Sequence, residues 1–296
     1  MGSASSQRQW RAFALPGILW LCLFVVVPAY AVVAMAMGRV NLLFQPVPAW
    51  DPTTWNPGFL SKAFSGALPG GEFWPSVRNT IVYVAASLAL CFAIGYPVAY
   101  YVARHAKRSK PLLIVLLVIP FWVSYLLRML AWIGLLSSDG YVNKVLSDIG
   151  ITHPPDWLNG NPWSVIIALV YGYIPYFILP VFAGIDRIDR SQIEAARDLG
   201  ATPWQAFRRV TLPLSRPAIL AGCALVVLPM FGDYYTNDLI SASPHTNMLG
   251  NQINLFVQGG AEKNLGASLV IVLMAILGVG MAYYLYATAR DARRLT

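Results

Sequence analysis

The sequence predicts an all-α membrane protein with six transmembrane helices, and its composition and hydropathy are the observations that predict it. Of the 296 residues, 57% are hydrophobic and only 11% are charged, and the mean hydropathy is +0.57. Soluble domains carry about 25% charged residues, so the chain belongs to the membrane class. Six stretches are long and apolar enough to cross roughly 30 Å of hydrocarbon. They cover approximately residues 12–37, 79–102, 112–135, 163–185, 217–237 and 267–288.

The distribution of basic residues predicts the orientation, because short cytoplasmic loops of membrane proteins are rich in Lys and Arg. With the N-terminus inside, 15 of the 21 Lys and Arg residues fall on the inner side. This bias accounts for the net charge of +8, so the charge does not indicate a nucleic-acid partner. The predicted organisation is a cytoplasmic N-terminus (1–11), a six-helix domain (12–288) and a cytoplasmic C-terminus (289–296), with an outer loop at 38–78 and a cytoplasmic loop at 186–216.

No pattern in the sequence indicates catalysis, a metal or a cofactor. The three cysteines all fall within predicted spans, where reduced, buried thiols are expected. His105, His153 and His245 lie in different loops and lack the spacing of metal ligands. The chain contains no G-x-x-x-x-G-K-[ST] loop, so ATP hydrolysis, if the protein uses it, must be supplied by another subunit.

The predicted outer loop is rich in proline and tryptophan. Five of its prolines, at positions 46, 48, 52, 57 and 69, favour extended or turn conformations, and its three tryptophans favour the boundary between water and lipid. We therefore expect a lid-like loop on the membrane surface. Both a contact with an external partner and simple membrane anchoring remain open.

An arginine and four aromatic residues share one face of the third predicted span. At 100° per residue, Phe121, Trp122, Tyr125, Arg128 and Trp132 fall within an arc of about 120°. An arginine near mid-span costs roughly 2.5 to 3.5 kcal/mol on insertion scales, so it should face protein or water. One interpretation is the lining of a pathway or gate. The other is an aromatic packing seam in which the arginine snorkels or bonds to backbone carbonyls.

Prolines interrupt the fourth and fifth predicted spans. Pro175 and Pro180 lie in the fourth, and Pro229 lies in the fifth. Each proline frees a backbone carbonyl, which is tolerated in membranes where protein or a cavity satisfies that group. A moving hinge and static packing are both consistent with this pattern.

Two carboxylates and neighbouring tyrosines follow Pro229 at the outer end of the fifth span. They are Asp233, Tyr234, Tyr235 and Asp238. Carboxylates pair with ammonium groups, and aromatic faces attract cations by roughly 0.5 to 2 kcal/mol each. The constellation suits a flexible polycation. The carboxylates would serve equally well as a helix cap or as a contact with another subunit.

The cytoplasmic loop predicts two short helices joined by a glycine elbow. Ser191 and Glu194 have the spacing of a capping box that begins the first helix, and Gly200 is expected in the left-handed conformation at its end. Thr202 begins a second helix, with Gln205 completing another capping box.

The second short helix is expected to be amphipathic. Trp204, Phe207 and Val210 recur at helical spacing, while Pro213 and Pro217 are expected to end the helix before the next hydrophobic run. The loop should therefore be a small docking element with an apolar side and a basic side.

Within this loop, Glu194-Ala195-Ala196, Gly200 and Val210-Thr211-Leu212-Pro213 resemble the EAA loop of ABC importer permeases, whose pattern is EAA-x3-G-x9-I-x-L-P. Every fixed position matches except Val210, where the family usually has isoleucine. In that family the loop docks in a cleft of the ATP-hydrolysing subunit. The resemblance implies ATPase-coupling roles for Glu194, Ala195, Ala196, Gly200, Leu212 and Pro213. An ordinary amphipathic loop on the membrane surface is the alternative.

The third span resembles, more specifically, the first of the two permeases of polyamine (spermidine/putrescine) importers. The likeness is carried by Pro120-Phe121-Trp122-Val123-Ser124, Arg128, Ala131-Trp132, Gly140, Asn143 and Gly150, and it extends over roughly residues 75–290. It implies the type I ABC importer permease fold in a bacterial inner membrane, with both termini cytoplasmic. The pathway or substrate candidates are then Trp122, Tyr125, Arg128, Trp132, Asp233, Tyr234, Tyr235 and Asp238.

The resemblance also implies partners and a mechanism. The partners are a second permease, two ATP-binding subunits, an external substrate-binding protein, membrane lipid and a polyamine substrate, and the mechanism is alternating access. A permease for another small solute, such as a sugar, phosphate or an iron complex, is the main alternative. A stand-alone secondary transporter would be expected to show inverted repeats and intramembrane carboxylate pairs, and a membrane enzyme would need clustered His, Asp or Glu. Neither pattern is evident in the sequence.

Overall fold

The computed structural model describes residues 14–43, 45–106, 108–151, 155–259 and 262–293. Its contacts divide the chain into two units. The first unit comprises Met1–Trp74 with Gln252–Ala275, and the second comprises Pro75–Asn251 with Ile276–Thr296. The predicted cytoplasmic N-terminus at 1–11 lies outside the described residues.

Helices of membrane-spanning length confirm the predicted all-α membrane class. Five described helices are long and apolar enough to cross a bilayer: Ala14–Ala36, Trp74–Arg104, Pro162–Asp186, Pro203–Phe231 and Lys263–Tyr286. A sixth candidate is a broken pair, Lys110–Trp122 and Tyr125–Asp148, whose two halves meet at an angle of 90°.

This break contradicts the expectation of one continuous helix over 112–135. The segment consists of α5 (Lys110–Val118), the short helix η3 (Ile119–Trp122) and α6 (Tyr125–Leu136). Val123 and Ser124 lie between them with extended ψ angles of 135° and 139°. Pro120 lacks an amide donor, so the chain tightens to a 3-10 turn around it and leaves the helix three residues later.

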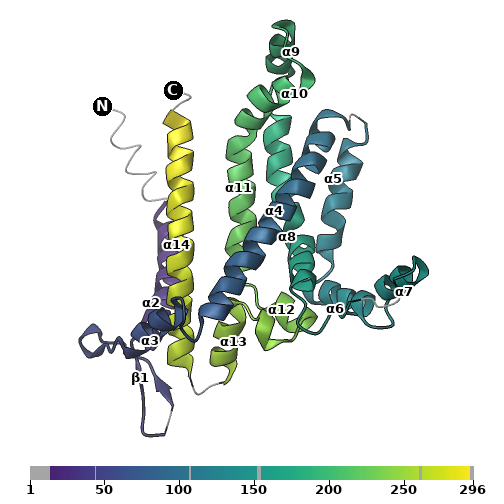
Figure 1. The fold of residues 1–296 in the computed structure, drawn as a ribbon. Coiled ribbons are helices and arrows are strands. Elements are labelled where there is room, and N and C mark those ends of the chain that lie inside the picture. Colours follow the sequence, from purple (N-terminus) through teal and green to yellow (C-terminus); the bar gives the residue numbers. More distant parts are fainter. Residues whose placement is uncertain (1–13, 44, 107, 152–154, 260–261, 294–296) are drawn as a thin grey trace, which may run out of the picture. The chain divides into compact units, whose positions relative to one another are not determined.

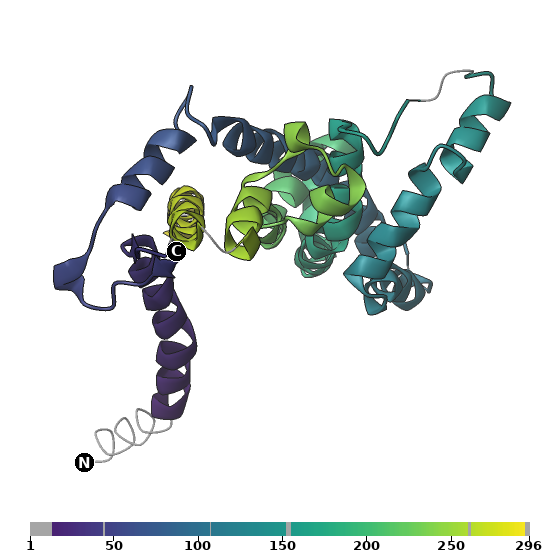
Figure 2. The same cartoon turned by 90° about the horizontal axis from the view of Figure 1, so that it is seen from below.

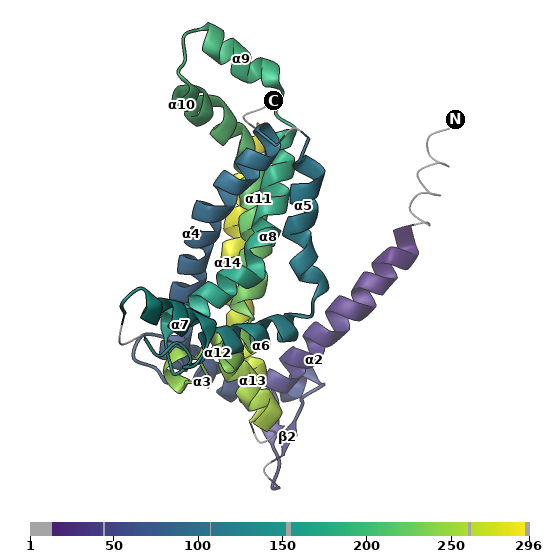
Figure 3. The same cartoon turned by 90° about the vertical axis from the view of Figure 1, so that its right-hand side faces the viewer.

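The core of the second unit lies among three long helices: α4 (Trp74–Arg104), α8 (Pro162–Asp186) and α11 (Leu212–Phe231). Figures 1 and 3 show them side by side. Phe177 of α8 is fully buried in this core with Cys91 of α4 and Met230 of α11. In lipid, helices associate through such close packing, because the surrounding hydrocarbon is as apolar as the side chains.

Small residues bring α8 and α11 into direct contact. A Cβ atom added at Gly184 would lie 2.2 Å from the Cβ of Ala218, which is far inside van der Waals contact. The two backbones can therefore approach this closely only while position 184 lacks a side chain. This contact lies near the ends of the two helices that carry the 186–216 loop.

The fifth span differs from its prediction at both ends. The helix runs without interruption from α10 (Pro203–Ala206) through the π-helical segment η4 (Phe207–Thr211) into α11, so Pro213 and Pro217 do not end it. A π-helical turn widens the backbone just before Pro213, whose ring would otherwise clash with the preceding turn. At its other end α11 stops at Phe231 rather than continuing to 237.

Short helices cover the opposite end of this bundle. They are α6 and α12 (Tyr235–Ile240), which both contact α8, and Figure 2 shows the light-green segment of α12 across the ends of the longer helices. The helix α7 (Tyr141–Asp148) follows α6 and extends away from the long helices (Figure 1). Thr80 of α4 accepts the Leu249 amide at 2.8 Å, and the Asn79 side chain donates to the His245 carbonyl at 2.8 Å. These bonds attach the segment after α12 to the start of α4.

The first unit contains the N-terminal span and the predicted outer loop. After the helix Ala14–Ala36, whose last part comprises η1 (Cys22–Val26) and α2 (Val27–Ala36), the chain forms β1 (Arg39–Val40), β2 (Pro46–Val47), η2 (Pro52–Thr54) and α3 (Gly58–Ala67). β1 and β2 pair in antiparallel register. The expectation of extended and turn conformations over 38–78 is thus wrong for α3. This helix lies between the prolines at 57 and 69 and contains no proline itself, so nothing in it interrupts the backbone hydrogen bonds.

The described part of the chain also contains α9 (Arg190–Asp198), the 3-10 helix η5 (Pro244–Thr246), α13 (Leu249–Gly259) and α14 (Lys263–Arg293). Within the first unit, the Asn264 side chain donates to the Met35 carbonyl at 2.7 Å. Phe73 and Phe256 meet edge to face, with ring centroids 5.8 Å apart. These contacts connect the start of α14 and the end of α13 to the N-terminal segments.

Glycine substitutions test the contact between α8 and α11. Gly184→Ala should lower the thermal unfolding temperature of the purified protein in detergent, because overpacking typically costs about 1 to 3 kcal/mol. Gly278→Ala in α14 is the matched control, since a Cβ there meets nothing within 4 Å and alanine favours the helix. Equal unfolding temperatures for the two variants would contradict the close approach at Gly184.

Candidate functional site

The 186–216 loop contains the predicted short helix and the glycine elbow, but the second helix is not short, because it continues from α10 into α11. α9 ends just before Gly200, whose φ of +88° is left-handed, and α10 begins at Pro203. The second capping box is confirmed: Gln205 Oε1 accepts the Thr202 amide at 2.9 Å, and Thr202 Oγ1 accepts the Gln205 amide at 3.3 Å. The elbow therefore depends on one residue that tolerates positive φ.

The cap of the first short helix differs from its prediction. Asp189, not Ser191, is the N-cap residue, and its Oδ1 accepts the Ser191 amide at 3.1 Å. Aspartate caps helices as well as serine does, and Asp189 precedes the helix in an extended conformation. The helix therefore begins at Arg190, one residue before the predicted cap.

The loop exposes large apolar side chains that have little cover from the described chain. Leu199 is 90% exposed and Trp204 is 67% exposed, with the Trp204 ring stacked on Phe207 at 5.3 Å between centroids. Beside the elbow lies a hollow of about 510 Å³, lined by Glu194, Arg197, Asp198, Gly200, Ala201, Thr202 and Pro203. A surface with protruding apolar groups next to a polar hollow is typical of a docking surface.

The other motif residues of the loop become more buried from α9 towards α11. Ala195 is exposed and Ala196 is half-buried on α9, while Leu212 and Pro213 are half-buried where η4 passes into α11. Leu212 packs against the core of the second unit. The motif therefore extends from an exposed surface to the root of a long helix.

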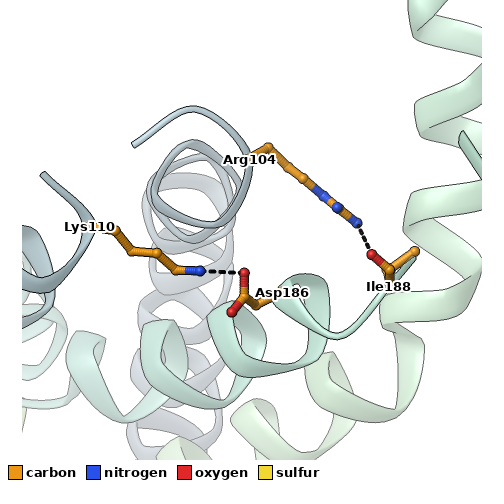
Figure 4. A network of polar contacts seen from close by, with 4 residues as sticks. All are labelled: Arg104, Lys110, Asp186 and Ile188. Carbon is orange, nitrogen blue, oxygen red and sulfur yellow. Dashed lines mark hydrogen bonds and ion pairs between the residues drawn. The ribbon is translucent and has the colours of Figure 1, made fainter. Parts of the chain in front are cut away.

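Two polar contacts fix the point where α8 leads into α9. Figure 4 shows them: Lys110 Nζ lies 2.5 Å from Asp186 Oδ1, and an Arg104 Nη donates to the Ile188 carbonyl at 3.0 Å. In the sequence, these basic residues indicate only the orientation of the chain. Their partners lie 76 and 84 residues away in the chain, so no local pattern could identify them.

A buried carboxylate organises the opposite end of the second unit. Asp233 is 7% exposed, and its Oδ2 accepts hydrogen bonds from Thr236 Oγ1 at 2.7 Å, the Tyr173 hydroxyl at 2.9 Å and the Tyr125 hydroxyl at 3.3 Å. Its Oδ1 accepts the Thr236 amide at 2.9 Å, at the beginning of α12. The Tyr125 hydroxyl also lies within hydrogen-bond distance of the Thr236 hydroxyl, so its single proton is shared between that oxygen and Asp233. The carboxylate thus has four donors and, in the described part of the chain, no ion-paired cation.

A buried arginine lies on the other side of Tyr125. Arg128 is 9% exposed, and its guanidinium carbon lies 4.6 Å from the ring centroid of Phe121, 5.2 Å from that of Tyr125 and 6.0 Å from that of Tyr171. Its Nε and Nη1 have no hydrogen-bond partner among the residues that the structure describes. Aromatic faces rather than backbone carbonyls therefore surround this cation.

The two tryptophan candidates of the third span, Trp122 and Trp132, have different surroundings. Trp132 meets Tyr171 edge to face at 5.4 Å, whereas Trp122, beyond the break, is 82% exposed. The expected common face of the third span is therefore wrong for Trp122, because the span is broken after η3 and there only Phe121, not Trp122, is directed to Arg128.

The tyrosine pair and the second carboxylate sit at the start of α12. Tyr234 and Tyr235 stack with ring centroids 4.3 Å apart. Asp238 is exposed, and its Oδ1 accepts the Asn251 side-chain amide at 2.7 Å. The two carboxylates are thus different in kind, since one is buried among hydroxyl donors and the other faces outward.

Two tyrosines from α8, Tyr171 and Tyr173, were not among the predicted site residues. A signal was present, because Tyr171, Tyr173 and Tyr176 follow one another within six residues of the fourth span. We name the group formed by Phe121, Tyr125, Arg128, Tyr171, Tyr173 and Asp233 the Asp–Arg cluster. The described residues include no group of three or more His, Cys, Asp or Glu side chains placed to hold a metal.

Solved structures share this fold. The chain superposes on a bacterial ABC transporter involved in the import of the acidic polysaccharide alginate, with a TM-score of 0.71 over 97% of this chain and 96% of that one at 20% identity. A second structure of the alginate transporter, with a pentasaccharide-bound periplasmic protein, gives the same score over 96% of each chain at 20% identity. At this identity the likeness concerns the fold alone.

Relatives found by sequence have a higher identity to this chain than these solved structures do. The chain is 36% identical over 266 residues to the spermidine/putrescine transport system permease protein PotB of Escherichia coli (strain K12), covering 90% of this chain and 92% of that protein. It is 33% identical over 265 residues to PotB of Haemophilus influenzae, covering 87% of both. Residues 77–294 match the family described as the binding-protein-dependent transport system inner membrane component. With its helical membrane fold and its helix–glycine–helix loop, this chain belongs to that family.

Proposed function

We propose that this chain is a transmembrane permease subunit of an ATP-driven importer for polyamines. The observation that carries the proposal is its 36% identity, over 90% of its length, to a spermidine/putrescine permease. The chain would form half of the pathway with a second permease, stand on two ATP-binding subunits and receive cargo from an external binding protein. The inner-membrane orientation, with both termini cytoplasmic, follows the excess of basic residues on one side.

The coupling role rests on the exposed loop. Leu199 and Trp204 offer apolar side chains to a partner, and Glu194 and Gly200 border the hollow beside them. The loop joins α8 to α11, which are in direct contact at Gly184. An ATP-binding subunit that closes against the loop would therefore push on both helices together, and alternating access would follow from their displacement.

The cargo assignment agrees with the chemistry of the Asp–Arg cluster. Asp233 is a carboxylate surrounded by tyrosines, and carboxylates and aromatic faces both attract ammonium groups. Asp238 and the stacked Tyr234 and Tyr235 lie on the same short segment at the end of α11. Cargo would pass these groups unchanged, and ATP hydrolysis would take place in the partner subunits.

Uptake measurements test the function directly. Vesicles bearing the full complex should accumulate labelled spermidine only when ATP is present inside. Asp233→Asn should raise the KM for uptake about tenfold, since an interaction of about 1.4 kcal/mol with an ammonium group is lost. Asp148→Asn in α7 is the control and should stay within about twofold, because that carboxylate is exposed, lies outside the candidate residues, and charges are weakly felt in water.

Two results would contradict the proposed function. Spermidine uptake that proceeds equally without ATP would rule out an ATP-driven importer. A well-assembled complex whose ATPase responds to its binding protein but never accumulates spermidine or putrescine would keep the importer architecture and reject the polyamine cargo.

Substitution of Gly200 tests the coupling loop. Gly200→Val should abolish most spermidine uptake, because a β-branched residue at φ +88° costs roughly 1 to 2 kcal/mol and the elbow would refold. Gly200→Asn is the control, since asparagine tolerates the left-handed conformation and nothing lies within 4 Å of a Cβ there. Co-purification of the ATP-binding subunits shows whether docking itself is lost. Wild-type uptake by the valine variant would refute the role of the elbow.

A further inference from the structure

Two opposite charges lie buried in the Asp–Arg cluster without forming an ion pair. Asp233 has hydroxyl and amide donors but no cation, and Arg128 has aromatic faces but no anion, among the residues the structure describes. Hydrogen bonds from neutral groups and contacts with aromatic rings stabilise charges without neutralising them. Both charges therefore retain their fields inside the protein, where screening is weak.

Tyr125 connects the two charges. Its hydroxyl donates to Asp233 at 3.3 Å, and its ring lies 5.2 Å from the guanidinium carbon of Arg128. The length of this bridge limits the separation of the charges to roughly 11 Å, at which unit charges still interact strongly in a protein interior. A cation that approaches the Asp233 carboxylate thus also experiences the positive charge of Arg128.

The broken third span builds the aromatic enclosure of Arg128. Phe121 belongs to η3 before the break, Tyr125 begins α6 after it, and Tyr171 is supplied by α8. Nε and Nη1 make no hydrogen bond to any described group, so Arg128 ties no two elements together through such bonds. A purely structural residue at this position would not require a charge, because burial of a cation without an anion is costly.

We propose that Arg128 acts as a built-in counter-charge that weakens the hold of Asp233 on cationic cargo and so permits its release. This inference rests on the proposed polyamine function. A buried carboxylate alone would bind an ammonium group tightly, and transport requires that binding be weak enough for the cargo to leave. Arg128 does not need to touch the cargo, because its repulsion acts through the field, and the repulsion grows with the number of charges on the cargo.

The test compares cargoes of increasing charge in the complete complex with its ATP-binding and substrate-binding partners. KM and maximal uptake rate are measured for putrescine, spermidine and spermine with the wild type, Arg128→Met and Arg128→Lys. Removal of the charge should lower the KM for spermidine roughly three- to tenfold and reduce the maximal rate, with a larger effect for spermine and a smaller one for putrescine. Arg128→Lys keeps the charge and should restore wild-type values.

A merely structural role gives a different result. It predicts that Arg128→Met lowers the maximal rate equally for all three cargoes, leaves or raises KM, and is not corrected by lysine. That result would overturn the inference while wild-type spermidine uptake leaves the proposed function intact. Arg128→Gln, which is neutral but polar and of similar length, gives the same comparison if the methionine variant fails to assemble. A wild-type complex that takes up no polyamine would overturn the proposed function and this inference together.

Discussion

The close contact between α8 and α11 is the constraint on which the rest of the second unit depends. Gly184 and Ala218 bring the helices together at the end that carries the 186–216 loop, and Phe177 occupies the core farther along. Packed protein interiors are nearly incompressible, so two helices in such contact move as one body rather than absorbing a displacement. The polar contacts of Asp186 and Ile188 attach the same region to α4 and α5.

α8 also links the loop to the Asp–Arg cluster. Asp186 ends this helix, and Tyr173 lies 13 residues earlier, which corresponds to about 20 Å along a helix. Pro175 and Pro180 lie between them, inside a helix that remains continuous. Each proline removes one backbone hydrogen bond, so these are the positions at which α8 bends most easily. In the proposed coupling, a displacement of the loop would bend α8 at these prolines and change how Tyr171 and Tyr173 face Asp233 and Arg128.

Local patterns in the sequence were sufficient to predict the helical membrane class and the elbow at Gly200. Hydropathy, the left-handed glycine and the Thr202–Gln205 cap each depend only on residues that are neighbours in the sequence. They failed where competing local options were close in energy. Asp189 displaced Ser191 as cap, and a π-helical turn let the helix pass Pro213. The break after Pro120 and the tyrosines of α8 depend on how distant segments pack. The partners of Asp233 were therefore beyond the reach of periodicity arguments.

The central claim is that the exposed loop receives an ATP-binding subunit, and maleimide labelling tests it most directly. Single cysteines would be introduced as Leu199→Cys, Trp204→Cys and Leu42→Cys, in a background whose three native cysteines are serine. Leu42 is 99% exposed and lies in the predicted outer loop, so it serves as the control. If the loop receives an ATP-binding subunit, adding these subunits should protect positions 199 and 204 from labelling and leave position 42 reactive. Equal labelling of all three positions with and without those subunits would contradict it.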